Sequence, residues 1–249
     1  MDPEVGRCRP LAVTEPLDRP IWHALRSRQS GFATGSALAL RYREDVSPFA
    51  AAVDDSADAL AALVAVIPPA GSILLLQAGV VPLPPGTVAE MVDEGVQMVA
   101  GRLEAPEVPP EILELGDADA AEMLELATLT RPGPFLSRTH RLGGFVGIRE
   151  DGRLIAMAGE RMKLPGFTEV SGVCTHPDYR GRGHAGLLSR IVAARIAARG
   201  ETPFLHAFAS NHAAIRLYGQ LGFVLRRRMS VALLRKATAP AQVPAGHGL

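Results

Sequence analysis

The chain has 249 residues, and its 26 lysine and arginine residues balance its 26 aspartate and glutamate residues. This length exceeds the roughly 100–150 residues of a typical domain, so either two lobes or one domain with a large extension fits it. The neutral charge argues against nucleic acid or an anionic membrane as a partner. No apolar stretch approaches the ~20 residues of a membrane-spanning helix, and the charged N-terminus lacks the apolar core of a signal peptide. We therefore expect a cytoplasmic protein.

The first 105 residues mix expected helices and strands but contain no motif that indicates chemistry. One helix is expected where Asp18 stands as an N-cap and Pro20 falls in the first turn, and another where Ser56 precedes an apolar stretch. The predicted elements are a helix at 18–29, a strand at 37–43, a helix at 56–67, and strands at 73–77 and 95–100. We therefore expect residues 1–105 to form a divergent α/β lobe.

A proline-rich stretch at 104–110 predicts a linker, and the pattern that follows it is more regular. Asp151-Gly152 between two apolar runs is typical of a hairpin turn, and Gly200 is placed to end a helix. In order, we expect a helix at 117–129, strands at 144–149, 153–163 and 168–175, a helix at 185–199, a strand at 203–209, a helix at 211–221 and a strand at 224–234. Residues 106–236 are thus predicted as a second domain, followed by a disordered tail at 237–249.

The segment from Arg180 to Gly186 joins a predicted strand to a predicted helix and is rich in glycine. Glycines leave the backbone N–H groups unshielded, and a helix start adds further free N–H groups and the positive end of the helix dipole. The helix that follows is amphipathic, with apolar side chains from Leu188 to Ile196 on one side, so we expect it to pack on a sheet. Together these features predict an anion site suited to a phosphate or a pyrophosphate.

Two other phosphate-binding motifs fit this loop less well. Gly181-x-Gly183-x-x-Gly186 matches the dinucleotide pattern in letters, but a five-residue loop containing Pro177 separates it from the preceding strand. The dinucleotide motif also places an acidic residue at the end of the next strand to bind a ribose, and none stands there. A Walker loop is excluded, because no Gly-Lys-Ser/Thr follows the glycines.

Two motifs resemble those of the GCN5-related N-acetyltransferases, the GNAT superfamily. They are Arg180-x-x-Gly183-x-Ala185 and Asn211-x-x-Ala214-x-x-Leu217-Tyr218-x-x-Leu221-Gly222-Phe223. The resemblance covers roughly residues 112–235 and is greatest to the FR47-like subgroup that includes glycine N-acyltransferase-like proteins. It implies an α/β (α+β) GNAT fold, with a mixed, mostly antiparallel central sheet flanked by helices. In that subgroup a divergent lobe precedes the catalytic one, which suggests such a lobe at 18–101.

The resemblance implies acetyl-CoA as the co-substrate and indicates where it binds. Backbone N–H groups of the loop would hold the pyrophosphate, and Arg180 would pair with phosphate. The strand end at 173–175 would lie beside the pantetheine arm, because in this family that strand splays from the next one and leaves backbone groups unpaired. Asn211 would cap its helix and contact the arm. The expected donor-binding residues are Val173, Cys174, Thr175, Arg180, Gly181, Arg182, Gly183, His184, Ala185, Gly186 and Asn211.

The resemblance also implies two catalytic residues. Tyr218 is expected to protonate or hydrogen-bond the departing thiolate, a task that suits a phenol, and a half-buried core tyrosine is the alternative interpretation. Glu169 is expected as the base that takes the amine's proton, directly or through water, and Glu160 is the alternative base. Cys174 is expected to be a small buried residue and not a nucleophile. No cluster of metal ligands is evident, so we expect no metal.

These features predict an N-acyltransferase that moves an acetyl group from acetyl-CoA to a primary amine by direct attack. The amine is expected to be a small molecule or a peptide that approaches from the side of segment 131–138. Two alternatives stay open: an acyl-CoA-binding protein without turnover, and a dinucleotide enzyme. A monomer and a homodimer are equally compatible with the sequence.

Overall fold

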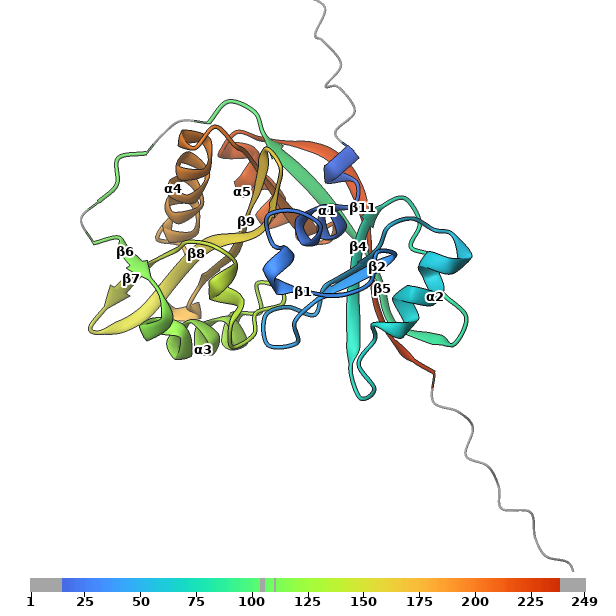
Figure 1. The fold of residues 1–249 in the computed structure, drawn as a ribbon. Coiled ribbons are helices and arrows are strands. Elements are labelled where there is room, and N and C mark those ends of the chain that lie inside the picture. The colour runs from blue at the N-terminus through green and yellow to red at the C-terminus, as the bar shows by residue number, and fades with distance from the viewer. Residues whose placement is uncertain (1–14, 104–105, 110, 238–249) are drawn as a thin grey trace, which may run out of the picture.

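The computed structural model describes residues 15–103, 106–109 and 111–237, and its central feature is an eight-stranded sheet (Figure 1). The predicted tail beyond residue 237 and part of the predicted linker lie outside the described residues. All neighbouring strands described in this sheet are antiparallel except β9 and β10, which confirms the predicted mixed, mostly antiparallel sheet. The spatial order is β4 (Ser72–Ala78), β11 (Phe223–Lys236), β5 (Thr87–Ala100), β10 (Thr202–Phe208), β9 (Phe167–Thr175), β8 (Arg153–Leu164), β7 (Phe145–Glu150) and β6 (Leu113–Leu115).

The hairpin of β7 and β8 turns at Asp151 and Gly152, as the sequence predicts. Both residues have positive φ, at 52° and 79°, which is the backbone conformation that a tight hairpin turn favours. The resulting register places Phe145 opposite Gly159. A Cβ at Gly159 would come within 2.4 Å of the Phe145 ring, so this register requires a glycine there.

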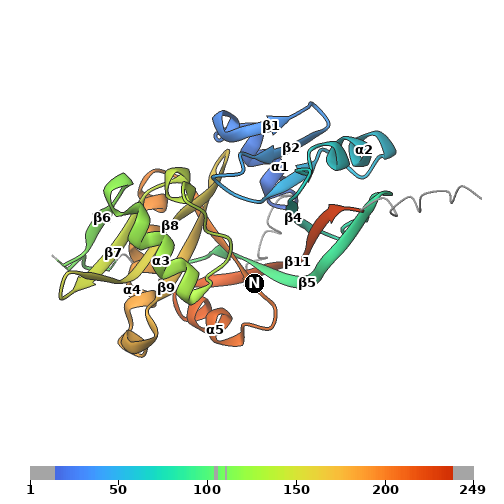
Figure 2. The same cartoon turned by 90° about the horizontal axis from the view of Figure 1, so that it is seen from below.

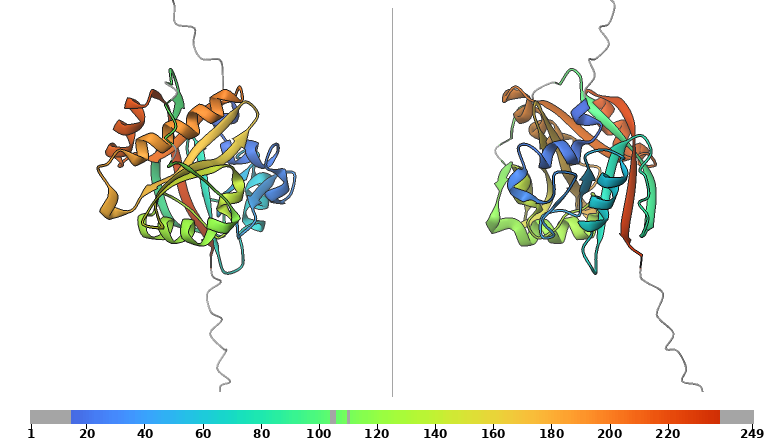
Figure 3. Two further views of the ribbon diagram at one scale, coloured as in Figure 1. Left: turned by 90° about the vertical axis from the view of Figure 1, so that its left-hand side faces the viewer. Right: turned by 45° about the vertical axis from the view of Figure 1, so that its right-hand side comes forward.

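Helices α3 (Ala120–Thr130) and α4 (His184–Ala198) cover opposite faces of the strands around β8. Neighbouring side chains of a strand point to opposite faces. On β8, Ile155 packs in the cluster that contains the apolar side of α4, while Leu154 packs in the cluster under α3. The left-hand view of Figure 3 shows the two helices apart, with strands passing between them. The predicted packing of α4 on the sheet is therefore confirmed.

The two halves of the chain are interleaved in the sheet. β5, green in Figure 1, bonds to β10 along one edge and to β11 along the other, and β4 bonds to the outer edge of β11. The strand predicted at 95–100 is only the last part of β5, since Glu90, Asp93 and Glu94 interrupt the first half, which lacks the apolar run of a buried strand. The domain boundary at residue 105 stays a prediction, but the sheet is continuous across it.

The remaining N-terminal elements form a layer on one side of β4, β11 and β5, and α5 lies on the other side (Figure 2). Ser56 caps its helix as predicted, accepting a hydrogen bond from the N–H of Ala59 at 3.3 Å. No helix among the described residues is long and apolar enough to cross a membrane. The other elements are α1 (Pro20–Leu25), α2 (Ala57–Ala65), α5 (His212–Gln220), β1 (Ala33–Gly35), β2 (Ala39–Tyr42), β3 (Ala50–Ala52) and 3₁₀ turns at Glu15–Leu17, Ser30–Phe32, Asp117–Asp119, Thr139–Leu142 and Pro177–Tyr179.

The predicted cap of the first helix is wrong. Arg19 stands at the N-cap of α1 and makes no capping bond with its side chain, and the helix ends at Leu25 instead of residue 29. Asp18 accepts hydrogen bonds from Arg226 and Arg227 of β11, at 2.6 and 2.8 Å. This acidic residue therefore ties the N-terminal layer to the last strand.

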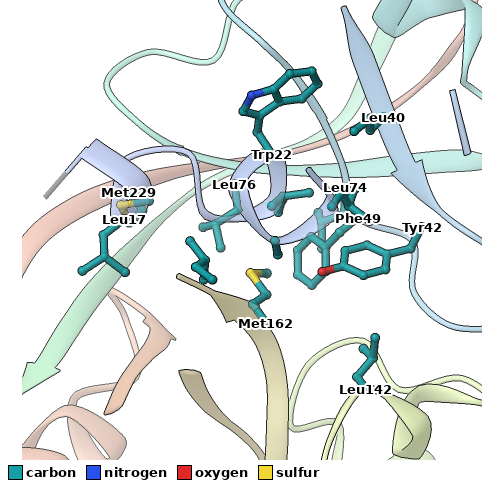
Figure 4. Close-up of a cluster of buried hydrophobic side chains, with 14 of the residues drawn as sticks. Leu17, Trp22, Leu40, Tyr42, Phe49, Leu74, Leu76, Leu142, Met162 and Met229 are labelled. Carbon is teal, nitrogen blue, oxygen red and sulfur yellow. The ribbon is translucent and has the colours of Figure 1, made fainter. Parts of the chain in front are cut away.

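A buried apolar cluster joins the N-terminal layer to the rest of the molecule (Figure 4). Trp22, Tyr42 and Phe49 come from the N-terminal layer, while Leu142 and Met162 come from the half that carries the glycine-rich loop. Burying each large apolar side chain contributes about 1.5–3 kcal/mol. The two halves of the chain thus stabilise one shared core.

Candidate active site

β9 and β10 are bonded to each other for only three residue pairs, the last of which is Glu169 opposite Phe204. Beyond this pair, β9 continues to Thr175 bonded to β8, and β10 continues to Phe208 bonded to β5. The two strands therefore splay apart, as expected for the strand end at 173–175. Along the splay, the facing backbone N–H and C=O groups have no partner strand among the described residues. Such groups need partners when a ligand covers them, so the splay suits a ligand that carries amides of its own.

The glycine-rich loop owes its shape to Gly181 and Gly183, whose φ angles are 79° and 82°. A Cβ at either position would meet nothing within 4 Å, so the left-handed backbone, and not crowding, accounts for these glycines. Gly183 is the N-cap of α4 and offers no side chain to bond the first N–H groups of the helix. Those groups remain available to an anion at the positive end of the helix dipole.

The splay and the loop line one cleft of about 890 Å³. Residues 130–132, at the end of α3, form another part of its wall. Arg182 does not line the cleft, since its side chain donates to Glu150 at 3.2 Å and lies over the Tyr179 ring. All the other predicted donor-binding residues line it: Val173, Cys174, Thr175, Arg180, Gly181, Gly183, His184, Ala185, Gly186 and Asn211.

Two polar atoms of this cleft, Thr175 Oγ1 and His184 Nε2, are buried without a hydrogen-bond partner in the described part of the chain. A buried polar atom left unpaired costs about 1–3 kcal/mol. Thr175 ends β9 and His184 begins α4, so the two atoms lie at the strand end and the helix start where coenzyme A was expected. A ligand with polar groups along the cleft would satisfy both atoms, so these residues fit coenzyme A.

Two further predicted residues of the cleft have clear structural roles. Asn211 caps α5, as predicted, with its Oδ1 accepting from the N–H of Ala214 at 3.1 Å. Cys174 is buried, and burial raises the pKa of its thiol to about 11. The thiol therefore stays neutral at physiological pH, which agrees with the expectation that Cys174 is not a nucleophile.

A second cavity of about 200 Å³ adjoins the cleft, and Tyr218 of α5 lines it. The side chain is largely buried, and its hydroxyl makes no hydrogen bond within the ranges that the structure describes. Burial, reinforced by the negative charge of Glu169, raises the pKa of Tyr218 to about 12. The phenol therefore keeps its proton at neutral pH. The residues shared by the two cavities are Arg131, Pro132, Val173, Asn211 and Ala214.

The surroundings of Glu169 do not fit its predicted role as a base. Its carboxylate is fully buried and accepts from Arg161 Nε and Nη2 at 2.8 and 2.7 Å, and it lies 2.7 Å from His206 Nδ1. Burial alone would raise the pKa of Glu169, but Arg161 and His206 outweigh it and hold the pKa at about 2. A carboxylate stabilised in this way takes up a proton poorly.

His206 does not replace Glu169 as a base, because both of its ring nitrogens are bonded. The amide of Gln97 accepts from Arg226 at its Oε1 and donates to the carbonyl of Leu17 from its Nε2. The same Nε2 lies 3.0 Å from His206 Nε2 and donates to it. In this hydrogen-bond network Nε2 of His206 accepts from Gln97 and Nδ1 donates to Glu169.

The alternative base, Glu160, lies outside both cavities. Its carboxylate pairs with Arg199 at 2.7 Å and with Lys163 at 2.8 Å. Sequence reasoning missed Arg161 and His206, although His206 interrupts the apolar run of β10, and Arg161 interrupts that of β8 together with Glu160. That interruption was the available indication of a buried charged site. Within the described residues, no group of three or more potential metal ligands occurs.

A parallel strand pair that splays beside a glycine-rich loop at a helix start is the arrangement of the GNAT fold. The sequence profile of the FR47-like protein family matches residues 145–231, which include the splay, the loop and Tyr218. A GNAT-family protein of known structure from Novosphingobium aromaticivorans is 47% identical to the chain, with a TM-score of 0.84. The match covers 90% of this chain and 99% of that one. The chain therefore belongs to the GCN5-related N-acetyltransferase family.

Two more distant structures share the fold alone. A GCN5-related N-acetyltransferase from Kribbella flavida is 19% identical, with 94% and 96% of the two chains covered and a TM-score of 0.59. A Drosophila protein is 20% identical, with 78% of this chain and 73% of that chain covered and a TM-score of 0.59. No curated protein sequence matches the chain.

Proposed function

We propose that the protein is an acetyl-CoA-dependent N-acetyltransferase that moves the acetyl group to a primary amine by direct attack. The observation that carries this proposal is the meeting of two cavities at the splay, one beside the glycine-rich loop and one beside Tyr218. A donor and an acceptor can thus reach a common point without a covalent enzyme intermediate. Family membership supports the same reaction class.

The donor cleft divides the binding of acetyl-CoA between loop and strand. Backbone N–H groups of Gly181 and of residues 183–186 hold the pyrophosphate at the start of α4, where the helix dipole favours negative charge. The unpaired edge of β9 at Val173–Thr175 bonds the amides of the pantetheine arm. The buried Oγ1 of Thr175 and Nε2 of His184 gain their missing partners from the same ligand.

In the transfer step, the amine nitrogen forms a bond to the thioester carbonyl carbon, and the bond from that carbon to sulfur breaks. Tyr218 donates its phenolic proton to the departing thiolate, which its raised pKa allows at neutral pH. The proton lost by the amine passes to water, because Glu169 and His206 are committed to each other and to Arg161 and Gln97. The phenolate of Tyr218 then takes a proton back from water, which closes the proton balance. The primary amine itself is a small molecule or a peptide.

An assay of CoA release tests this proposal against a protein that binds acyl-CoA without turnover. Acetyl-CoA is offered with a panel of primary amines to the wild type and to Tyr218→Phe, and CoA binding is measured separately by thermal shift. Turnover by the wild type that falls in the variant supports the transferase. Tight CoA binding with no turnover of any amine favours the non-catalytic protein, and a thermal shift with NAD(H) but not CoA favours a dinucleotide enzyme.

A further inference from the structure

The second cavity has an apolar wall that comes mostly from outside the loop and helix of the donor site. Phe49 and Leu74 belong to the N-terminal half of the chain, as does Leu76, and Val231 belongs to the last strand. The volume of about 200 Å³ is below the 300–1,000 Å³ of cavities that hold drug-sized ligands. An acceptor that fits here is therefore small and has an apolar part.

The charges of this cavity are all positive. Among the described residues that line it, Arg131 and Arg161 are the charged ones, and no aspartate or glutamate is present. A polyamine or another polycation would meet two arginines and no carboxylate at the cavity wall. The buried Glu169 offsets the charge of Arg161 but not that of Arg131, and the repulsion that remains is strongest where water is excluded. An acceptor for this cavity instead carries a negative group beside its amine.

The guanidinium of Arg161 has N–H donors that no acceptor among the described residues uses. A guanidinium carries five N–H donors, and Glu169 takes one from Nε and one from Nη2. Nη1 has no hydrogen-bond partner within the described residues, although the side chain is only 10% exposed. The group is held in place by Glu169 and by the Phe49 ring, whose centroid lies 4.9 Å from the guanidinium carbon. The Nη1–Nη2 edge is thus fixed in position and suits a carboxylate, which can accept two parallel hydrogen bonds.

A long acyl chain fits this cavity less well than an amino carboxylate does. An acyl chain would cover the apolar wall but would leave Nη1 of Arg161 buried and unpaired. Such unpaired groups are costly, and those of charged residues most of all. A carboxylate on an apolar body satisfies both the arginine and the wall.

We propose, on the basis of the transferase function above, that the acceptor is an α-amino acid or a related amino carboxylate with an apolar side chain. Its carboxylate pairs with the free edge of Arg161. Its apolar part lies against Phe49, Leu74, Leu76 and Val231. The amine is then directed to the junction with the donor cleft, where Val173 lines both cavities.

Matched amines test this inference in the CoA-release assay. L-Leucine and L-leucinamide share the same body and differ in the charged carboxylate, glycine lacks the apolar part, and spermidine is a polycation. We expect kcat/KM for L-leucine to exceed that for L-leucinamide at least about tenfold, since a hydrogen bond to a charged group is lost in the amide. Equal or better use of L-leucinamide, glycine or spermidine overturns the inference.

A binding measurement separates this inference from the proposed function. L-Leucine and L-leucinamide are titrated by calorimetry into the protein saturated with CoA. Binding of leucine that is at least about tenfold tighter than that of the amide supports the carboxylate site, even if no amine is turned over. Absence of leucine binding, or equal affinity for leucine and leucinamide, overturns the carboxylate site. The proposed transferase function is judged separately, and it stands if only amines without a carboxylate are turned over.

Two variants locate the effect in the cavity. Arg161→Lys keeps a cation for Glu169 but removes the two N–H donors of the Nη1–Nη2 edge. We therefore expect KM for leucine to rise about 10- to 100-fold and KM for leucinamide to change little. Arg149→Lys is the control, since that arginine pairs with Asp119 outside both cavities. Leu76→Phe makes the cavity smaller at its apolar wall and leaves the Arg161–Glu169 pair unchanged. It should raise KM for leucine more than KM for glycine. If the folded Arg161→Lys variant keeps the wild-type preference for leucine over leucinamide, or the folded Leu76→Phe variant that for leucine over glycine, the inference is overturned.

Discussion

Phe204 of β10 lies opposite Glu169 of β9 at the last bonded pair before the two strands splay apart. Glu169 accepts hydrogen bonds from Arg161 of β8 and His206 of β10, so its carboxylate fastens three strands together where the splay begins. The two cavities open beyond this point. The acidic residue predicted as the base therefore serves to position the site.

Substitution of Gly183 by valine should weaken acetyl-CoA binding at least about tenfold. The position has a φ of 82°, and a residue with a Cβ pays about 1–2 kcal/mol to adopt the left-handed backbone. Relaxation of that strain turns the N–H groups at the start of α4 away from the pyrophosphate. The dissociation constant for acetyl-CoA, measured by calorimetry, checks this result.

Gly166→Val is the matched control for the loop variant. Gly166 has a φ of 77° in the turn between β8 and β9, and a Cβ there meets nothing within 4 Å, as at Gly183. Both variants should lose similar stability in a urea melt, but only Gly183→Val should lose affinity. An equal loss of affinity in the two would show that general strain, and not the phosphate loop, is responsible.

Tyr218→Phe should lower kcat by about 100-fold or more, the range of a lost general acid, with little change in the affinity for acetyl-CoA. Stability should change little, since the hydroxyl has no hydrogen-bond partner within the described residues. Tyr42→Phe is the control. Its hydroxyl donates to Gln29 at 2.7 Å, so that variant should lose about 0.5–1.5 kcal/mol of stability and keep its kcat. If Tyr218→Phe instead lost stability and kept its kcat, Tyr218 would be a core tyrosine without a catalytic role.

The pH dependence of the wild type follows from the same residue. Because the pKa of Tyr218 is raised to about 12, the phenol stays protonated through the alkaline range in which an acceptor amine loses its proton. The rate of CoA release should therefore rise with pH up to about 10, with no alkaline decline that belongs to Tyr218. A decline near pH 8 that disappears in Tyr218→Phe would contradict the raised pKa.

The loop and its helix were predictable because their chemistry is local. Gly181 and Gly183, just before an amphipathic stretch, specify the left-handed turns that lead into the helix, and Asp151-Gly152 specifies a hairpin turn. Each of these predictions needs only residues that are neighbours in the chain. The structure accordingly bears out the hairpin and the helix, and places the loop at the cleft, whereas the splay was expected from the family resemblance alone.

The surroundings of Glu169 were not predictable in this way. Its partner Arg161 lies across a hairpin, and His206 comes from a strand 37 residues further along the chain. Only the sheet register brings the three side chains together, and burial then changes a plausible base into a buried ion pair. The placement of β5 between β10 and β11 is likewise a property of the topology, since no local pattern records which strands will be neighbours.

Glu169→Gln should remove a specific part of the acid sensitivity of the fold. Folding lowers the pKa of Glu169 from its ordinary value of 4.5 to about 2. Its contribution to stability is therefore complete above pH 4.5 and is lost as the pH falls toward 2. In urea melts, the gap between wild type and variant should be widest at pH 7 and should close between pH 4.5 and 2. Glu44→Gln, at a mostly exposed position, should show a small gap at every pH.

Residues 106–249 expressed alone should not form a cooperatively folded protein, because the sheet depends on a strand from the first half of the chain. β5 bonds to both β10 and β11, so its removal exposes two strand edges and the apolar faces beside them. The fragment should lack a cooperative thermal transition by circular dichroism. Co-expression with residues 1–105 should restore it, since β4 and β5 then resume their places in the sheet. A cooperative transition in the isolated fragment would instead support two independent lobes.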